Sequence, residues 1–378
     1  MAELHDLTAL EQGAAIRNGE TSSAELVEHY LARIERLSGE LGAFVTVTDE
    51  SARAAAAEAR GGGPLAGVPT AIKDLNAVAG VPARFGSVLF RDFVPDVSDE
   101  VVLRIEHAGL VSLGKTNTPE FGSPCYTEPD PDVIAPPAVT PYDTSRMAGG
   151  SSGGAATAVA GGLVPLAQGS DGGGSIRIPA SCCGLVGFKP TRGVISGSPL
   201  YGDPVGLGTN GPLARTVRDA AALLDVMAGR AVGDPTWAPV EPYLAACGRA
   251  PGRRRVARFV EPVITEAVID DECRSAWEDA SRLLEDLGHE VVKASSGAAA
   301  LEVLQSGKPV DLLITDYAMP GMTGVQLAEA ARKLRPGLPI LLATGYADLP
   351  ARTKLDLPRL SKPYQQRQLA ERITSLVG

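Results

Sequence analysis

The chain has 378 residues, of which 44% are hydrophobic and 21% are charged, and its formal net charge is −10. This composition predicts a soluble globular protein of two or three domains and excludes a disordered chain. The negative charge argues against binding to nucleic acid, in spite of the basic run at 253–255. The most apolar segment, 155–166, is too short to span a bilayer, so we expect no membrane contact.

The cysteines and the first residues of the chain indicate the cellular compartment in which we expect the protein. Cys125, Cys182, Cys183, Cys247 and Cys273 form no C-x-x-C pair and are odd in number, which favours a reducing environment. The amino terminus, MAELHDLTALEQ, has acidic residues and no apolar core, so a signal peptide is not expected. We therefore expect a cytoplasmic protein.

Apolar periodicity in the first 250 residues predicts helices that alternate with short strands. A capping box formed by Ser22 and Glu25 opens a helix over 21–37, in which Leu26, Tyr30 and Ile34 recur at helical spacing. Further helices are predicted at 51–60, 155–161 and 215–227, and strands at 68–72 and 110–114. Such alternation is typical of an α/β layered fold.

After about residue 250 the pattern becomes a regular series of strand–helix units. Strands are predicted at 256–260, 289–294, 311–316, 339–344 and 357–360, and helices at 271–287, 297–305, 324–334 and 365–376. Five such units in so short a stretch predict a doubly wound parallel sheet. We therefore expect two domains, over 1–250 and 251–378.

The segment 168–181, QGSDGGGSIRIPAS, places three glycines directly before Ser175. A serine hydroxyl is a weak nucleophile unless a neighbouring base accepts its proton, and the usual base is histidine. The four histidines, His5, His29, His107 and His289, all lie far from this segment in the sequence. A lysine can replace histidine if burial lowers its pKa, because desolvation disfavours the ammonium form.

Lys73 ends a predicted apolar strand, and the segment 149–154, GGSSGG, supplies a second serine-bearing turn. One of its serines could pass the proton of Ser175 to Lys73, while glycine N–H groups stabilise the developing oxyanion. A phosphate-binding loop is the rival interpretation of the glycines. The pattern G-x-x-x-x-G-K-[ST] is missing, however, and Asp171 would repel a phosphate.

These motifs, with GLVGFKPTRG and FGSPCYTEPD, resemble the amidase signature family from the amino terminus to about residue 290. The resemblance implies a mixed-sheet core and hydrolysis of a small-molecule carboxamide by a Ser–cis-Ser–Lys triad, without a cofactor. Its positions are Ser175 as the nucleophile, Ser151 as the bridging serine and Lys73 as the base. The oxyanion hole would be formed by Gly172, Gly173, Gly174 and Ser175.

Other residues near these motifs are expected to have structural roles. Asp171 and Arg177 flank the glycines and should hold the loop rather than react. Cys125, Cys182 and Cys183 are interpreted as small core residues rather than nucleophiles.

From about residue 288 the sequence resembles a response-regulator receiver domain, which has a flavodoxin-like fold. The phrases LLITDYAMPGMTG, PILLATGYAD and LSKPY carry the resemblance. It implies that Asp316 is the phosphoacceptor, Thr344 the switch hydroxyl and Lys362 the lysine that contacts the phosphoryl group. The family holds Mg²⁺ with a pair of acids after its first strand, and Glu261 alone stands there, so no metal is predicted.

The two resemblances meet at a seam near 283–292, and the receiver-like part shares its first strand and helix with the amidase-like part. The chain therefore has the form of a fusion in which both parents are shortened. The predicted function is that of an amidase. A signalling or interaction protein that works through intramolecular or protein contacts of the receiver-like domain is the alternative, as is a hybrid with impaired catalysis.

Overall fold

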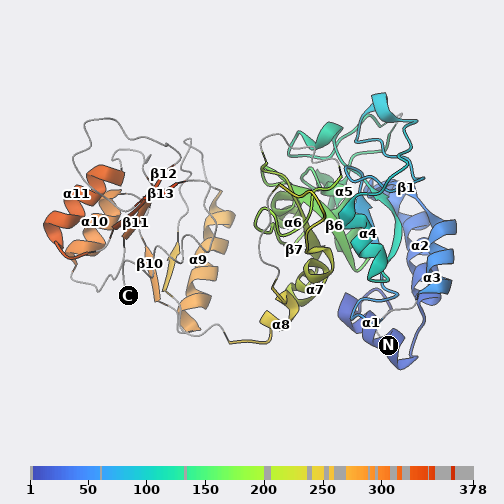
Figure 1. Cartoon of the computed structure of the whole chain (residues 1–378), viewed down its shortest axis with the longest axis horizontal. Coiled ribbons are helices and arrows are strands. Elements are labelled where there is room, and N and C mark those ends of the chain that lie inside the picture. The colour runs from blue at the N-terminus through green and yellow to red at the C-terminus, as the bar shows by residue number, and fades with distance from the viewer. Residues whose placement is uncertain are drawn as a thin grey trace. The chain divides into compact units, whose positions relative to one another are not determined.

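A computed structural model of the chain describes residues 3–59, 62–131, 134–199, 206–235 and 241–250. It also describes the segments 255–258, 270–287, 290–293, 297–306, 313–316, 324–338, 340–344 and 359–361. The chain divides into two compact units, Met1–Arg249 and Ala250–Gly378 (Figure 1).

The described part of the first unit contains a mixed sheet and an antiparallel sheet. One sheet has the order β1-β3-β2, with β2 parallel and β1 antiparallel to β3; its strands are β1 (Phe44–Val47), β2 (Pro69–Lys73) and β3 (Val111–Thr116). A second, antiparallel sheet has the order β6-β8-β7 and contains β6 (Leu166–Asp171), β7 (Val186–Gly187) and β8 (Thr209–Ala214). The short pair β4 (Val139–Thr140) and β5 (Asp143–Met147) stands apart.

Side-chain hydrogen bonds join the two sheets along β2 and β6. The Thr70 hydroxyl donates to the carbonyl of Leu166 at 3.2 Å, and the Lys73 N–H donates to the Gln168 side-chain oxygen at 2.8 Å. The ends of β2 and β6 therefore lie side by side, and the loops that follow these strands meet at one edge.

Helices cover both faces of these strands (Figure 1). They are α1 (Ala9–Asn18), α2 (Ser23–Leu41), α3 (Asp49–Glu58), α4 (Glu100–His107), α5 (Gly153–Ala160), α6 (Arg177–Cys182), α7 (Val217–Met227) and α8 (Tyr243–Ala246), with 3₁₀ turns at Val88–Phe90 and Glu120–Gly122. The predicted capping box is confirmed, since Ser22 and Glu25 each accept the other's backbone N–H. Helices α1, α4, α6 and α8 were not predicted. Within the described segments, no helix combines the length and apolar character that a membrane span requires.

The alternating side chains of β2 explain why helices are needed on both faces. Ala71 belongs to a buried cluster with Leu26 of α2 and Val159 of α5. Its neighbour Ile72 belongs to the opposite cluster, with Ile105 of α4 and residues of α7. Since successive strand residues point to opposite faces, a strand covered on both sides is apolar along its whole length.

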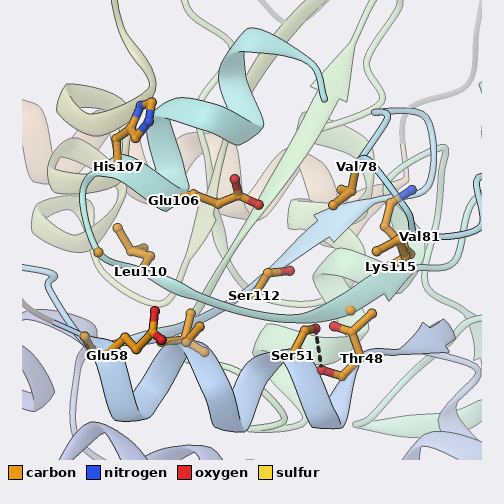
Figure 2. Close-up of a pocket in the computed structure, with 15 residues that line it drawn as sticks. Thr48, Ser51, Glu58, Val78, Val81, Glu106, His107, Leu110, Ser112 and Lys115 are labelled. Carbon is orange, nitrogen blue, oxygen red and sulfur yellow. Dashed lines mark hydrogen bonds between the residues drawn. The ribbon is translucent and has the colours of Figure 1, made fainter. Parts of the chain in front are cut away.

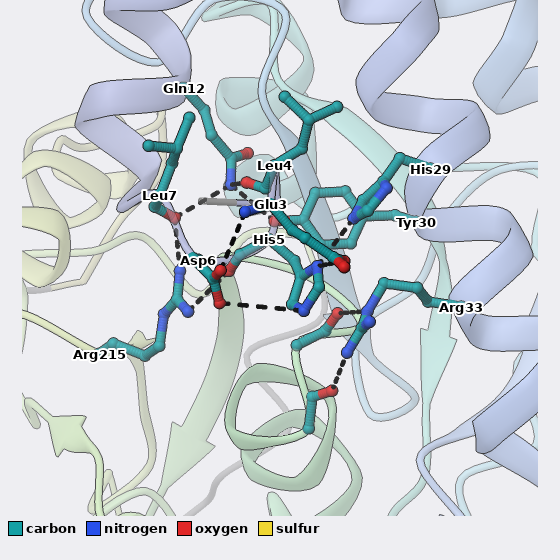
Figure 3. A network of polar contacts seen from close by, with 12 residues as sticks. Glu3, Leu4, His5, Asp6, Leu7, Gln12, His29, Tyr30, Arg33 and Arg215 are labelled. Atoms are coloured by element: carbon teal, nitrogen blue, oxygen red, sulfur yellow. Dashed lines mark hydrogen bonds and ion pairs between the residues drawn. The ribbon is translucent and has the colours of Figure 1, made fainter. Parts of the chain in front are cut away.

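The amino-terminal residues are fixed by a partly buried polar network (Figure 3). The Gln12 amide nitrogen donates to the carbonyl of Leu4 at 3.1 Å and lies 2.6 Å from the Tyr30 hydroxyl. The Arg215 guanidinium donates to the carbonyls of His5 and Leu7 at 2.7 and 2.5 Å. The segment before α1 is thus tied to α2 and to the start of α7.

In its described segments, the second unit contains two parallel sheets and three helices. The strands β9 (Arg255–Arg258) and β10 (Glu290–Lys293) pair with each other, and a sheet of order β11-β12-β13 is formed by β11 (Leu313–Asp316), β12 (Ile340–Thr344) and β13 (Arg359–Ser361). The helices are α9 (Asp271–Asp286), α10 (Gly297–Gln305) and α11 (Gly324–Leu334).

These elements agree with the predicted ones to within two residues at each end. The helix predicted at 365–376 lies outside the described residues. Among the described strands no pairing connects β9 to β11. The α/β fold of the first unit is therefore established, while a single doubly wound, flavodoxin-like sheet in the second remains a prediction.

Candidate active site

Lys73 ends β2 as predicted, and its side chain is completely buried. Its Nζ donates to the hydroxyls of Ser151, Ser152 and Ser170 at 2.7, 2.9 and 3.1 Å. The Ser170 carbonyl lies 3.4 Å from the same nitrogen. Within the described part of the chain, this amine has no carboxylate at hydrogen-bond distance.

The surroundings of Lys73 favour its neutral form. Burial lowers the pKa of Lys73 to about 7, and the negative charge of Asp171 opposes that shift only in part. An amine with this pKa is half deprotonated near neutral pH, so it can accept a proton.

The GGSSGG turn presents its two serines to Lys73 in different ways. The peptide bond between Gly150 and Ser151 is cis, and Ser151 is 2% exposed. The Ser152 hydroxyl also donates to the Ser170 carbonyl at 3.1 Å and accepts the Ser170 N–H at 3.2 Å. Ser152 therefore attaches the turn to β6, while Ser151 lines a pocket.

The loop after β6 is held by Asp171, the buried last residue of that strand. Its carboxylate accepts the N–H groups of Gly174 at 2.7 Å and Ile176 at 3.1 Å. The Arg177 guanidinium donates to both carboxylate oxygens at 2.9 and 3.0 Å. Burial raises the pKa of Asp171, but these hydrogen bonds outweigh it and leave a pKa of about 2. The expectation that Asp171 and Arg177 hold the loop is confirmed.

The same loop carries the predicted oxyanion donors. The Gly174 N–H is already hydrogen-bonded to Asp171, so it is not free for the role predicted for it. The N–H groups of Gly172, Gly173 and Ser175 donate to no acceptor in the described part of the chain. Three of the four predicted donors therefore remain open to a ligand.

A pocket of about 780 Å³ lies over this loop and the GGSSGG turn. Ser151 and Ser175 both line it, and Ser175 is half-buried. The carbonyl of Ser175 accepts the Ser152 N–H at 3.1 Å, whereas its hydroxyl has no hydrogen bond to another described residue. The pocket thus brings together an unpaired serine hydroxyl, a serine in contact with a buried lysine, and free backbone N–H groups.

Other residues singled out from the sequence lie elsewhere. His5 and His29 contact each other at 3.0 Å, and His107 lines a different pocket. The prediction that Cys125 is a core residue is wrong, because it is exposed and lines the larger pocket. Cys183 is buried as predicted.

The receiver-like positions are described only in part. Asp316 and Thr344 are the last residues of the neighbouring strands β11 and β12. Lys362 directly follows β13, and both it and Glu261 lie outside the described residues.

A smaller pocket of about 370 Å³ lies between α3, β3 and the end of α4 (Figure 2). Glu106 and Ser112 line it, together with Lys115. Lys115 is paired with Asp74 at 2.7 Å, so this pocket offers no free amine. Across the described residues, no group of three or more His, Cys, Asp or Glu side chains could hold a metal ion.

Sequence reasoning missed the polar residues of β6. Ser170 contacts Lys73, and the Gln168 amide donates to the side chains of Asn76 and Asn210 at 2.8 Å each. A signal was present, because Gln168 and Ser170 alternate within an otherwise apolar segment directly before the glycine loop. Polar residues in a buried strand need partners, and here those partners are site residues.

Fold and site together define an α/β protein with a serine–lysine constellation under a glycine-rich loop. The family model described as Amidase matches residues 25–304, and the chain belongs to that family. The model described as Response regulator receiver domain matches residues 267–374, so the two matches overlap over 267–304.

Individual relatives agree with the family assignment. A putative amidase of Synechocystis sp. is 41% identical over 78% of this chain and 60% of its own length. The 6-aminohexanoate-cyclic-dimer hydrolase of Paenarthrobacter ureafaciens is 40% identical over 75% of this chain and 58% of its own. The structure of 6-aminohexanoate cyclic dimer hydrolase complexed with substrate superposes with a TM-score of 0.72 at 33% identity, covering 89% of this chain and 76% of that one. The chain thus spans about three fifths of the length of the curated relatives it matches.

Proposed function

We propose that the first unit is an amidase that hydrolyses a carboxamide through an acyl-enzyme on Ser175. The observation that carries the proposal is the 2.7 Å contact between the buried Lys73 amine and Ser151, in a pocket that Ser175 shares. The family membership supports the same reaction class, because the relatives include a putative amidase and a 6-aminohexanoate-cyclic-dimer hydrolase.

The proposed reaction begins with proton transfer between three side chains. Neutral Lys73 takes the proton of Ser151 as Ser151 takes that of Ser175, and the Ser175 Oγ attacks the carbonyl carbon. The resulting oxyanion accepts hydrogen bonds from the N–H groups of Gly172, Gly173 and Ser175. Each such bond stabilises the transition state by about 3 kcal/mol in other oxyanion holes.

Collapse of that intermediate breaks the C–N bond. The proton held by Lys73 returns through Ser151 to the departing nitrogen, which leaves as ammonia or an amine. Water then attacks the acyl-enzyme with the same groups acting as base, and a carboxylic acid leaves while Ser175 regains its proton. No cofactor takes part in this sequence of steps.

The test is labelling with a fluorophosphonate, which phosphonylates activated serine hydroxyls, followed by mass-spectrometric mapping. We expect stoichiometric modification of Ser175 and none in Ser175→Ala. Ser151→Ala should slow labelling by a factor of about 10² or more, because it interrupts proton transfer. Ser152→Ala is the matched control, since Ser152 contacts the same lysine but does not line the pocket.

Two results would contradict this assignment. Labelling that persists in Ser175→Ala, or that maps to Cys125, would show a different nucleophile. Equal slowing by Ser151→Ala and Ser152→Ala would show that the turn supports Lys73 without relaying a proton.

For the second unit we propose a receiver-like interaction domain that is phosphorylated weakly at Asp316. We propose a domain boundary near 250 and a seam of the two sequences at 283–292, which the overlap of the two family matches over 267–304 supports. Phosphoryl transfer to a carboxylate needs a metal to offset negative charge, and Glu261 is a poor replacement for a pair of acids. Beryllofluoride with Mg²⁺ should therefore change the melting temperature little. A saturable response that is lost in Asp316→Asn would show that an acidic site exists.

A further inference from the structure

Two copies of the tripeptide Phe-Gly-Ser occur in the first unit, at 85–87 and 121–123. In both copies the phenylalanine and the glycine have positive φ, 52° and 68° in the first and 51° and 66° in the second. Positive φ is uncommon for any residue with a side chain and is an outlier for a bulky one. Among the described residues, Phe85 and Phe121 alone of the non-glycine residues have it. Strained conformations of this kind are retained where a site requires them.

The two turns hold each other in place. The Phe121 N–H donates to the Phe85 carbonyl at 2.8 Å. The Ser87 hydroxyl donates to the carboxylate of Glu120, next to Phe121, at 2.7 Å. Backbone and side-chain bonds thus fix the same pair of segments, so neither phenylalanine can relax alone.

The glycines of both turns permit this close packing. A Cβ on Gly86 would lie 2.5 Å from the Thr118 carbonyl oxygen. A Cβ on Gly122 would lie 2.6 Å from a Leu75 methyl carbon and 3.1 Å from the Ser151 hydroxyl. The second turn therefore lies directly against the proposed bridging serine.

The phenylalanines of the paired turns anchor an aromatic cluster. The ring centroid of Phe85 lies 5.2 Å from that of Phe90 and 6.1 Å from that of Phe93. The centroids of Phe121 and Phe90 are 6.0 Å apart. Four of the seven phenylalanines of the chain gather here. Phe121 remains 53% exposed, so its ring has surface left for a ligand.

Both Phe85 and Phe121 line the pocket that contains Ser151 and Ser175. Charged side chains also line it, namely Asp99, Asp234 and the exposed Arg192, and both carboxylates accept hydrogen bonds from protein donors. Asp99 accepts from the Asn76 amide at 2.8 Å, and Asp234 accepts from the Ser196 hydroxyl at 2.7 Å. Phe85 and Phe121 thus give the pocket an aromatic wall in addition to these charged groups.

We propose that the paired turns form a subsite for an apolar group, so that the chain prefers carboxamides that carry an aryl or alkyl substituent. The inference rests on the proposed amidase function, because it assigns the substrate class of the same pocket. An aromatic wall gains free energy from an apolar group by removing its surface from water and by ring–ring contact. It gains little from a small or charged amide.

The test measures binding rather than turnover. Dissociation constants for benzamide, acetamide and succinamate, which carries a carboxylate, are measured by ligand-observed NMR on Ser175→Ala. We expect benzamide to bind at least tenfold more tightly than acetamide, and succinamate no more tightly than acetamide. Phe85→Asn and Phe121→Asn should each weaken benzamide binding by roughly tenfold and leave acetamide within a factor of two.

Asparagine is chosen because it tolerates positive φ, so the variants lose the ring without added backbone strain. Phe93→Asn is the matched control, since Phe93 belongs to the cluster but is not among the described residues that line the pocket. Melting temperatures show whether each variant is folded, and Phe85→Leu and Phe121→Leu replace any that is not; a smaller loss of benzamide binding is then expected, because leucine keeps an apolar surface and removes only the ring–ring contact.

Equal binding of benzamide and acetamide overturns the inference, as does tighter binding of succinamate or an equal effect of Phe93→Asn. Failure of fluorophosphonate labelling at Ser175 in the parent chain is a separate result. It removes the proposed reaction, while the binding data still decide whether the subsite exists.

Discussion

Two fully buried lysines lie on the neighbouring strands β2 and β3, and they are stabilised in opposite ways. Lys115 of β3 forms an ion pair with Asp74 at 2.7 Å. Lys73 of β2 has hydroxyls and a carbonyl around its amine, while the nearby Asp171 is bound to Arg177 and loop N–H groups. Burial is the same, but within the described residues Lys115 has an ion-pair partner and Lys73 does not.

The difference shows why burial alone does not identify a functional lysine. A buried charge must be paired or neutralised, because transfer from water to the interior costs several kcal/mol. Lys115 is paired, and burial raises the pKa of its partner Asp74, an effect that Lys115 partly offsets. Lys73 is unpaired, and its pKa falls to about 7. The unpaired amine is the one suited to proton transfer.

The largest expected effect is on reactivity at Lys73. Lys73→Met should slow fluorophosphonate labelling of Ser175 by about 10²–10⁴, the usual contribution of a general base. Because it removes an unpaired buried amine, the same change should not lower the free energy of unfolding. Labelling kinetics and urea denaturation measure the two quantities. A substantial loss of stability in Lys73→Met would mean that its hydroxyl contacts serve the fold.

Lys115→Met, in contrast, should lower the free energy of unfolding. It leaves the Asp74 carboxylate buried without its cation, and breaking a buried pair typically costs about 3–5 kcal/mol of stability. Replacing both partners, as Lys115→Met with Asp74→Asn, should recover most of that loss. Denaturation of the single and double variants gives the coupling free energy directly. A single variant as stable as the parent would show that the pair contributes nothing to the fold.

Features that depend on residues close together in the chain could be predicted from the sequence. Features that depend on long-range contacts could not. The capping box of Ser22 and the apolar stripe of α2 are local, and both were predicted correctly. The glycine loop and the GGSSGG turn were located from their motifs. The arrangement of Ser170 under Lys73 depends on the alignment of β2 with β6, which are about a hundred residues apart in the chain. Single-sequence patterns do not encode that alignment.

The two Phe-Gly-Ser turns with positive φ show a second limit of prediction from the sequence. Phe-Gly-Ser at 85–87 and at 121–123 gives no local signal for positive φ at phenylalanine, since propensity alone disfavours it. The conformation results from the contact between two segments, through the Phe121–Phe85 backbone bond and the Ser87–Glu120 side-chain bond. The proposed aromatic wall therefore could not be predicted from either segment alone.

The pH dependence of labelling tests the pKa of Lys73 itself. With a pKa of about 7, the neutral fraction of the amine rises roughly tenfold between pH 6 and pH 8, so labelling should rise likewise and then level off. The ordinary pKa of lysine is 10.5, so the unfolded chain binds the extra proton between about pH 7 and 10.5. The stability difference between the parent and Lys73→Met should accordingly shift in favour of the parent as pH rises through that window. A labelling rate that still rises tenfold from pH 8 to pH 10 would contradict the shifted pKa.

The smallest effect concerns a pair of partly buried histidines near the amino terminus. His5 and His29 contact each other at 3.0 Å through ring nitrogens, a contact that requires at least one neutral ring (Figure 3). Burial lowers the pKa of both, and the positive charge of Arg33 adds to the shift. Glu3, 3.3 Å from His5, opposes it only in part.

Since these folded-state pKa values lie below 6.5, the unfolded chain binds protons first as pH falls, and the folded state loses stability below about pH 6.5. We expect a loss of about 0.5 kcal/mol between pH 7 and pH 5, because both rings are only partly buried and the acids nearby compensate. His29→Gln keeps a hydrogen-bonding side chain without the titration, so it should reduce this slope. Urea denaturation at the two pH values measures the difference. An unchanged slope in His29→Gln would mean that, unlike Lys73, this pair is buried too little for its titration to matter to the fold.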